Sequence, residues 1–167
     1  MKKFEYPVGS IIELLGHNTP HCGVVVSDYN SVELIARKDE IQRKVTCKLI
    51  LVDLVTTRLH PVNNKPPEYK LRQSPSFPWE TSQIKSRIGT LKPKYHDSDY
   101  HIIYNNCQHF AWELSTGKAD SPDADKFDLI GGLIGWAFHI KDFGSNSSAS
   151  AGSMAHLSQS LDSFLLI

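Results

Sequence analysis

The stretch from Tyr100 to Leu114, Y-H-I-I-Y-N-N-C-Q-H-F-A-W-E-L, places a cysteine directly after two residues that favour the start of a helix. Asn105 and Asn106 can each cap free backbone N–H groups, and apolar residues follow at helical spacing. The pattern therefore predicts Cys107 in the first turn of a helix. Unpaired N–H groups and the positive end of the helix dipole stabilise a thiolate there, which makes Cys107 a candidate nucleophile. The alternative is a buried, inert cysteine, because free cysteine is among the most buried residue types.

Upstream of this helix, β-branched runs alternate with turn-forming residues. Four runs have the composition of strands, and the sequence D-Y-N at 28–30 favours a tight turn between two of them. The strands are expected at residues 8–15, 21–27, 31–36 and 44–55. A helix is expected at 79–88 with Gly89 as its stop, and the proline-rich segment 61–78 is expected to be a loop. An antiparallel sheet combined with helices predicts an α+β fold.

The hairpin predicted at 21–36 supplies two polar residues that could act with Cys107. Side chains on one face of adjacent antiparallel strands have Cβ atoms about 5 Å apart, so His21 and Glu33 can form a hydrogen bond if they share a face. His21 is then the candidate base, and Glu33 orients its imidazole. A solvent-facing position is the alternative for Glu33. His17 is a rival base, but it lies in the turn sequence G-H-N-T-P, where a polar loop residue is ordinary.

The sequence N-N-C-Q-H-F around Cys107 resembles the N-C-E-H-F box of the lecithin:retinol acyltransferase (LRAT) family. That family belongs to the circularly permuted, NlpC-type papain-like enzymes. The segment H-C-G-V-V-V-S-D-Y, which begins at His21, is similar to the family's H-W-G-I-Y-V-G-D-G segment. Tyr100 matches a tyrosine that the family carries before the N-C pair, and S-R-I-G at Ser86 to Gly89 resembles the helix end that precedes it. The resemblance covers roughly residues 7–117.

The resemblance implies an α+β, circularly permuted papain-like (NlpC-type) domain with the nucleophile at a helix N-terminus. It implies acyl transfer or hydrolysis through a thioester on Cys107, with His21 as base and a phospholipid or other acyl ester as substrate. Family acyltransferases carry a second histidine twelve residues after the first, and Glu33 occupies that position here. Two other functions stay open. One is a cysteine peptidase or deconjugating isopeptidase, and the other is a catalytically silent interaction protein of the viral type with the same two boxes.

Composition divides the chain into four parts. Residues 1–117 correspond to the LRAT-like catalytic domain, and residues 118–127 read as a polar linker. Residues 128–143 are apolar but shorter than the roughly 20 residues that a membrane-spanning helix needs. Residues 144–167 combine a Ser-rich linker with an amphipathic helix. We expect Leu129 to Ile140 and Met154 to Ile167 either to contact a membrane peripherally or to pack on the domain.

The overall composition excludes several classes of protein. The 167 residues contain 18 Lys and Arg and 18 Asp and Glu, so no net positive charge attracts nucleic acid. Three cysteines without C-x-x-C pairing favour neither a disulfide framework nor a metal site. His96, His101 and His109 also lack a second, paired ligand group for zinc. We therefore expect a cytoplasmic protein, free or peripheral at membranes, that lacks an export signal and uses no metal and no other cofactor.

Overall fold

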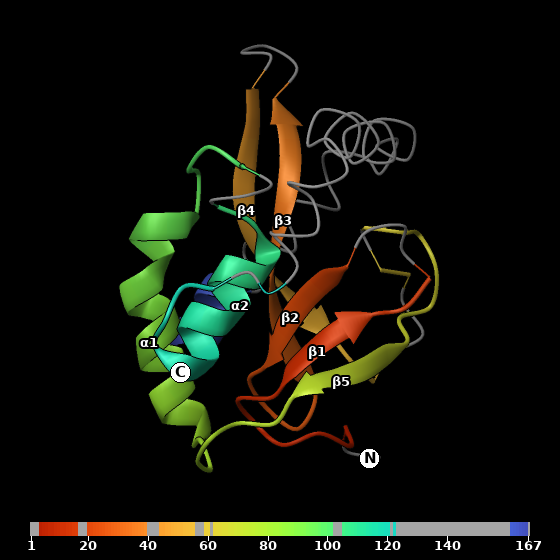
Figure 1. Cartoon of the computed structure of the whole chain (residues 1–167), viewed down its shortest axis with the longest axis vertical. Coiled ribbons are helices and arrows are strands. Elements are labelled where there is room, and N and C mark those ends of the chain that lie inside the picture. Colours follow the sequence, from red (N-terminus) through yellow and green to blue (C-terminus); the bar gives the residue numbers. More distant parts are fainter. Residues whose placement is uncertain are drawn as a thin grey trace.

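The computed structural model describes residues 4–16, 20–39, 44–55, 59–60, 62–101, 105–120, 122 and 161–166. These residues confirm the predicted α+β class, with an antiparallel sheet and helices packed against it (Figure 1). The strands are β1 (Ile11–Leu14), β2 (His21–Val25), β3 (Asn30–Asp39), β4 (Lys44–Asp53) and β5 (Tyr69–Gln73). The main helices are α1 (Thr81–Tyr95) and α2 (Cys107–Thr116). The order of the 5-stranded sheet is β4-β3-β2-β1-β5.

The hairpin of β2 and β3 forms where the turn sequence predicts it. Ser27 Oγ accepts the backbone N–H groups of Tyr29 and Asn30, so a side chain replaces the backbone partners that the turn lacks. β3 and β4 pair along their whole length, whereas β2 pairs with β3 only from Ser31 to Glu33. The far part of the β3–β4 ribbon therefore extends beyond the other strands (Figure 1).

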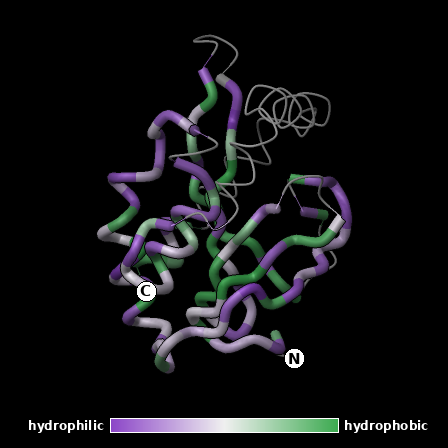
Figure 2. The backbone as a smooth tube through the Cα atoms, viewed as in Figure 1, coloured by the Kyte–Doolittle hydropathy of each residue, from purple (hydrophilic) through white to green (hydrophobic). Residues whose placement is uncertain are grey.

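The sheet carries apolar side chains on both faces. α2 packs on β2 and β3, and α1 packs on β4 and beside α2. The core between the sheet and the helices includes Val24, Leu34, Ile88 and Phe110. A second, smaller core covers the opposite face, and its members are Leu14, Ile35, Ile50, Val52 and Val62, with Tyr69 packed against them. Figure 2 shows that hydrophobic residues concentrate in the central strands, whereas α1 is largely hydrophilic.

β5 lies inside the segment that the prolines mark as a loop, so the loop prediction is wrong for Tyr69–Gln73. The strand pairs with β1, and Arg72 forms an ion pair with Glu13 at 2.7 Å. β5 is an edge strand with partly exposed side chains, so its sequence lacks the apolar run that identifies an inner strand. Periodicity alone therefore gives no signal for it.

α1 passes through Gly89, where the sequence predicts its end, and continues to Tyr95. A glycine inside a helix costs about 1 kcal/mol relative to alanine. Burial of Tyr95 outweighs that cost, because this side chain is 1% exposed and its ring meets Phe110 edge-on at 5.3 Å between centroids. The helix therefore ends where its last core contact is made.

The end of the chain packs on α1. The predicted apolar segment at 129–140 lies outside the described residues, as does most of the predicted amphipathic helix, but residues 161–166 are helical. Leu161 is buried in the core that contacts the helices, Asp162 pairs with Lys92, and Lys85 Nζ lies 4.2 Å above the ring of Phe164. None of the helices among the described residues is long and apolar enough to cross a membrane.

Leu161→Ala is expected to lower the free energy of unfolding by about 2–4 kcal/mol, because it removes buried contacts and leaves a cavity. Leu166→Ala is the matched control, since this leucine is 87% exposed and its loss should cost less than about 0.5 kcal/mol. Urea denaturation of both variants measures the difference. Equal, small effects would show that the end of the chain does not stabilise the domain.

Candidate active site

Cys107 is the first residue of α2, as its sequence predicts. The side-chain oxygen of Asn106 accepts the backbone N–H groups of Gln108 at 2.9 Å and His109 at 3.1 Å, which fixes the helix start. Cys107 Sγ lies 3.8 Å from the carbonyl oxygen of Pro20, the residue that precedes β2. The side chain is buried, with 4% of the residue exposed. The helix start thus places the sulfur against the end of β2.

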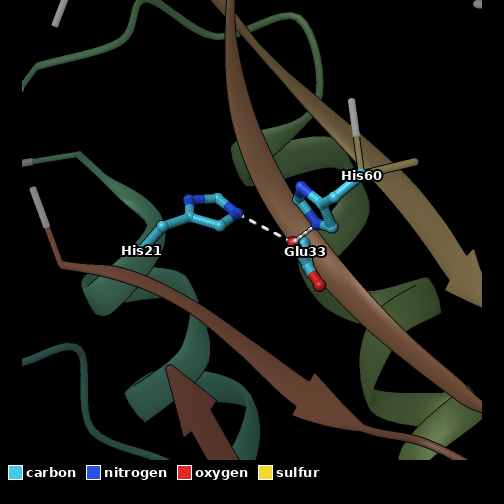
Figure 3. Close-up of side chains that lie close together, drawn as sticks. All are labelled: His21, Glu33 and His60. Carbon is cyan, nitrogen blue, oxygen red and sulfur yellow. Dashed lines mark hydrogen bonds and ion pairs between the residues drawn. The ribbon is translucent and has the colours of Figure 1, made fainter. Parts of the chain in front are cut away.

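His21 and Glu33 share one face of the sheet and form the hydrogen bond that the hairpin predicts. Glu33 pairs in register with Gly23, so His21 is its diagonal neighbour, two residues along β2. His21 Nε2 lies 2.8 Å from Glu33 Oε2, and both residues are buried (Figure 3). The solvent-facing alternative for Glu33 is wrong, because none of the residue is exposed. The hydrogen bond between His21 and Glu33 that the hairpin predicts is therefore present.

Gly23 makes room for the Glu33 side chain. A Cβ atom on Gly23 would lie 2.6 Å from Glu33 Cγ, which is closer than carbon atoms approach in proteins. The glycine is therefore required by the close approach of the carboxylate side chain across the strand pair.

The imidazole of His21 interacts with Cys107 as well as with Glu33. Burial alone would lower the pKa of His21, but the charge and hydrogen bond of the Cys107 sulfur, followed by those of the Glu33 carboxylate, raise the pKa to about 10. Because Nε2 is bonded to Glu33, Nδ1 is the ring nitrogen left to interact with the sulfur. The three predicted site residues thus form one chain of contacts in the order Cys107, His21, Glu33.

The Glu33 carboxylate accepts two hydrogen bonds on each oxygen. Oε2 accepts hydrogen bonds from His21 Nε2 and His60 Nε2, each at 2.8 Å. Oε1 accepts hydrogen bonds from the hydroxyl groups of Tyr69 at 2.7 Å and Ser31 at 3.0 Å. An ionised carboxylate has about four acceptor positions, so this set saturates it. Burial would raise the pKa of Glu33, but electrostatic attraction and hydrogen bonds from the His60 and His21 rings hold it well below its ordinary value.

His60 is the site residue that the sequence does not reveal. It is fully buried and contacts Glu33 from a segment 27 residues away (Figure 3). Its ring packs edge-on against the rings of His21 and Tyr69. Its sequence context, L-H-P, contains no strand, helix or ligand pattern. The only available signal is a histidine outside the predicted elements, which is too common to select His60 for a role.

Among the residues that the structure describes, one group has the composition of a metal site. His21, Glu33 and His60 have ligand atoms that all lie within 4.8 Å of one another. The backbone N–H of Val62 donates to His60 Nδ1 at 3.1 Å, so Nδ1 carries no proton and Nε2 carries it. A metal would need the Nε2 lone pair, which this tautomer does not offer. The group therefore fits a hydrogen-bond network and not a metal centre.

The other candidate histidines have structural contacts. His96 Nδ1 accepts the backbone N–H of Leu49 at 3.1 Å, and His109 Nδ1 lies 3.0 Å from the capping oxygen of Asn106. His101 forms an isolated bridge with Asn105. The rival base, His17, lies outside the described residues.

The helix start also bears on how a negative oxygen could be held during acyl transfer. The N–H groups of Gln108 and His109 donate to the Asn106 cap, which removes two of the donors expected for this purpose. The N–H of Cys107 itself does not donate to that cap. It is therefore the donor of the first helical turn that remains closest to the reacting sulfur.

The other two cysteines are poor competitors for reaction. Cys22 and Cys47 have no exposed surface, whereas 4% of Cys107 is exposed. Burial raises the pKa of Cys47 to about 11, so this thiol stays protonated at neutral pH. Cys107 is therefore the candidate nucleophile among the three, because it alone combines a small exposed fraction with a histidine contact.

Comparison with known proteins adds no assignment: no protein-family model matches the chain, and no curated protein matches it significantly.

Gly23→Ala is expected to lower the free energy of unfolding by about 1–3 kcal/mol and to slow alkylation of Cys107, because the new Cβ displaces Glu33. Gly89→Ala is the control. It adds a methyl group with no atom within 4 Å and should stabilise α1 by about 0.5–1 kcal/mol without changing alkylation. Urea denaturation and iodoacetamide labelling measure both. A Gly23→Ala variant that labels at the wild-type rate would contradict the packing argument.

Cys107→Ala should lower the pKa of His21, because it removes the charge and hydrogen bond of the sulfur and leaves burial in place. In the wild type the imidazole should keep its proton through neutral pH and lose it near pH 10, and in the variant it should lose the proton at lower pH. NMR titration of the ring nitrogens measures both values. His96 is the internal control, because no Cys107 charge contributes to its shift. Identical His21 titrations would exclude the Cys107–His21 contact.

Proposed function

We propose that this protein is a cysteine-dependent acyltransferase or hydrolase that forms a thioester on Cys107. The observation that carries the proposal is the buried chain of contacts from the Cys107 sulfur through His21 to the fully buried Glu33. A thiol, an imidazole and an orienting carboxylate in this order are the parts of a nucleophilic acyl-transfer site. The roles of the three residues are proposed on that chemical basis.

The proposed reaction has two steps. With the proton that His21 has taken from Cys107 held on the imidazole, the thiolate attacks the acyl carbonyl carbon while the Cys107 N–H donates to the oxygen that becomes negative. The S–C bond forms, the C–O bond of the ester breaks, and His21 returns the proton to the departing alkoxide. Water or another acceptor then attacks the thioester, with His21 as base, and frees the thiol.

We also propose that the fold belongs to the permuted papain-like type, as in LRAT-like proteins. In that arrangement the histidine strand precedes the cysteine helix along the chain, which agrees with the order of His21 and Cys107. One feature differs from the resemblance: the S-R-I-G sequence lies within α1 and does not end it. The order and the polar triad therefore support the proposal, and the helix boundary does not contribute to it.

An apolar acyl ester, such as a phospholipid, is the proposed substrate. Two exposed leucines are sequence neighbours of residues at the site: Leu15 follows the β1 residue that pairs with His21, and Leu59 precedes His60. Apolar side chains near the reacting group favour the binding of an acyl chain. Of the two segments proposed for membrane contact, residues 161–166 direct Leu161 and Phe164 to the core, which leaves Leu129 to Ile140 as the better candidate.

Incubation with a diacyl phospholipid is expected to increase the intact mass of the protein by one acyl group, and peptide mapping should place that group on Cys107. Cys107→Ala should abolish the adduct, because the nucleophile is lost. His21→Gln should reduce its rate by at least about 100-fold, the lower range for loss of general acid–base catalysis. Gly89→Ala serves as the folded control, since a Cβ at this position would meet no neighbouring side chain within 4 Å.

A parallel incubation with ubiquitin-like conjugates separates the alternatives. Cleavage of the conjugates that depends on Cys107, without a lipid adduct, would replace lipid acyl transfer by isopeptidase activity. Absence of both reactions across several acyl donors would leave a catalytically silent interaction protein.

A further inference from the structure

His60 has the contacts of a residue that fixes the position of Glu33. Its Nε2 lies 2.8 Å from Glu33 Oε2, the same oxygen that receives His21, and neither side chain of the His60–Glu33 pair is exposed. A buried hydrogen bond to a carboxylate is stronger than a neutral one, and it constrains the direction of the acceptor. His60 therefore acts on the atom that orients the proposed base.

The proton of His60 is fixed by the backbone. Val62 N donates to His60 Nδ1 at 3.1 Å, and an N–H group can only donate. Nδ1 must then accept, and the single proton of a neutral imidazole is on Nε2, directed at Glu33. His60 is thus held as a donor, and a change to the other tautomer would break both hydrogen bonds.

The Glu33 carboxylate cannot turn without losing contacts. Tyr69 and Ser31 hold Oε1 while His60 shares Oε2 with His21, so rotation about the last side-chain bond would break several hydrogen bonds at once. The rings of His21 and Tyr69 flank His60 at 5.8 and 6.2 Å between centroids. The carboxylate is thereby held in one orientation, with Oε2 aimed at His21 Nε2.

From these contacts we infer that His60 is a positioning residue of the Cys107 site, so that the working group is Cys107, His21, Glu33 and His60. This inference rests on the proposed function, because it assigns His60 a role in supporting His21. His60 acts through Glu33, which it contacts, and not on the sulfur itself. It holds Glu33 so that His21 keeps Nδ1 directed at Cys107 and keeps the charge that stabilises the thiolate.

The test uses the full chain and needs no substrate: the rate of Cys107 alkylation by iodoacetamide is measured against pH. In His60→Leu the donor to Glu33 is lost, the carboxylate turns, and support for the His21 imidazolium weakens. We expect the alkylation rate at neutral pH to be about tenfold lower. The curve of rate against pH should move by about one unit to higher pH. His60→Gln, whose amide N–H can donate to Glu33, should restore most of the rate.

His96→Leu is the matched control for loss of a histidine that accepts a backbone N–H. His96 Nδ1 accepts from Leu49 N at 3.1 Å, as His60 Nδ1 accepts from Val62 N, but His96 does not contact Glu33. Its loss should lower stability and leave the alkylation profile unchanged. Thermal denaturation of all variants measures that stability cost separately.

Three results would overturn the inference: a His60→Leu profile like that of the wild type, a faster rate in that variant, or failure of His60→Gln to restore the rate in a folded protein. Binding of zinc with a Kd in the micromolar range or below, lost in His60→Gln, would also overturn it and assign the group to a metal. A shifted profile without any acyl adduct would support the role of His60 and reject the proposed acyl transfer.

Discussion

A buried carboxylate is stable only when its oxygens are hydrogen-bonded, and Glu33 imposes this requirement on much of the fold. Removal of an unpaired carboxylate from water costs far more than a single hydrogen bond returns. Hydrogen-bond donors from four separate places offset this cost: β2, β3, β5 and the segment at residues 59–60. The glycine at position 23 leaves the space that the side chain fills. Several features that look unrelated along the sequence thus serve one acceptor.

The position of His21 at the start of β2 connects the two faces of the sheet. Glu33 lies on the face away from the helices, together with Ile35 and Ile50, whereas Cys107 belongs to the core on the helix side. A histidine in the middle of a strand would face one side only. Because His21 is the first residue of its strand, its ring can meet the sulfur at the end of the sheet and still reach the carboxylate.

The parts of the site that the sequence predicts are those fixed by local pattern. The Asn106 cap determines where α2 begins, and the alternation along the β2–β3 hairpin places His21 and Glu33 on one face. Tyr69 and His60 could not be predicted, because they lie 36 and 27 residues from Glu33 and approach it only in the folded protein. Their own sequence contexts, an edge strand and a short connection, carry no periodic signal.

The fold shows the same division between local and distant contacts. Prolines around residues 69–73 indicate a loop, yet pairing with β1 makes this segment a strand. Gly89 indicates a helix end, yet the distant contact between Tyr95 and Phe110 extends the helix beyond it. In both cases a weak local preference, worth about 1 kcal/mol, is overridden by tertiary packing.

A carboxylate in the orienting position changes the balance between the two steps of the proposed reaction. In the free protein the sulfur and Glu33 together raise the pKa of His21, which favours the imidazolium. Once the sulfur is acylated it carries no negative charge, so only Glu33 supports the imidazolium while burial opposes it. The pKa of His21 then falls, and the imidazole becomes available as the base that activates the acyl acceptor. The same three residues would thus supply an acid in the first step and a base in the second, with acylation itself as the change that converts one into the other.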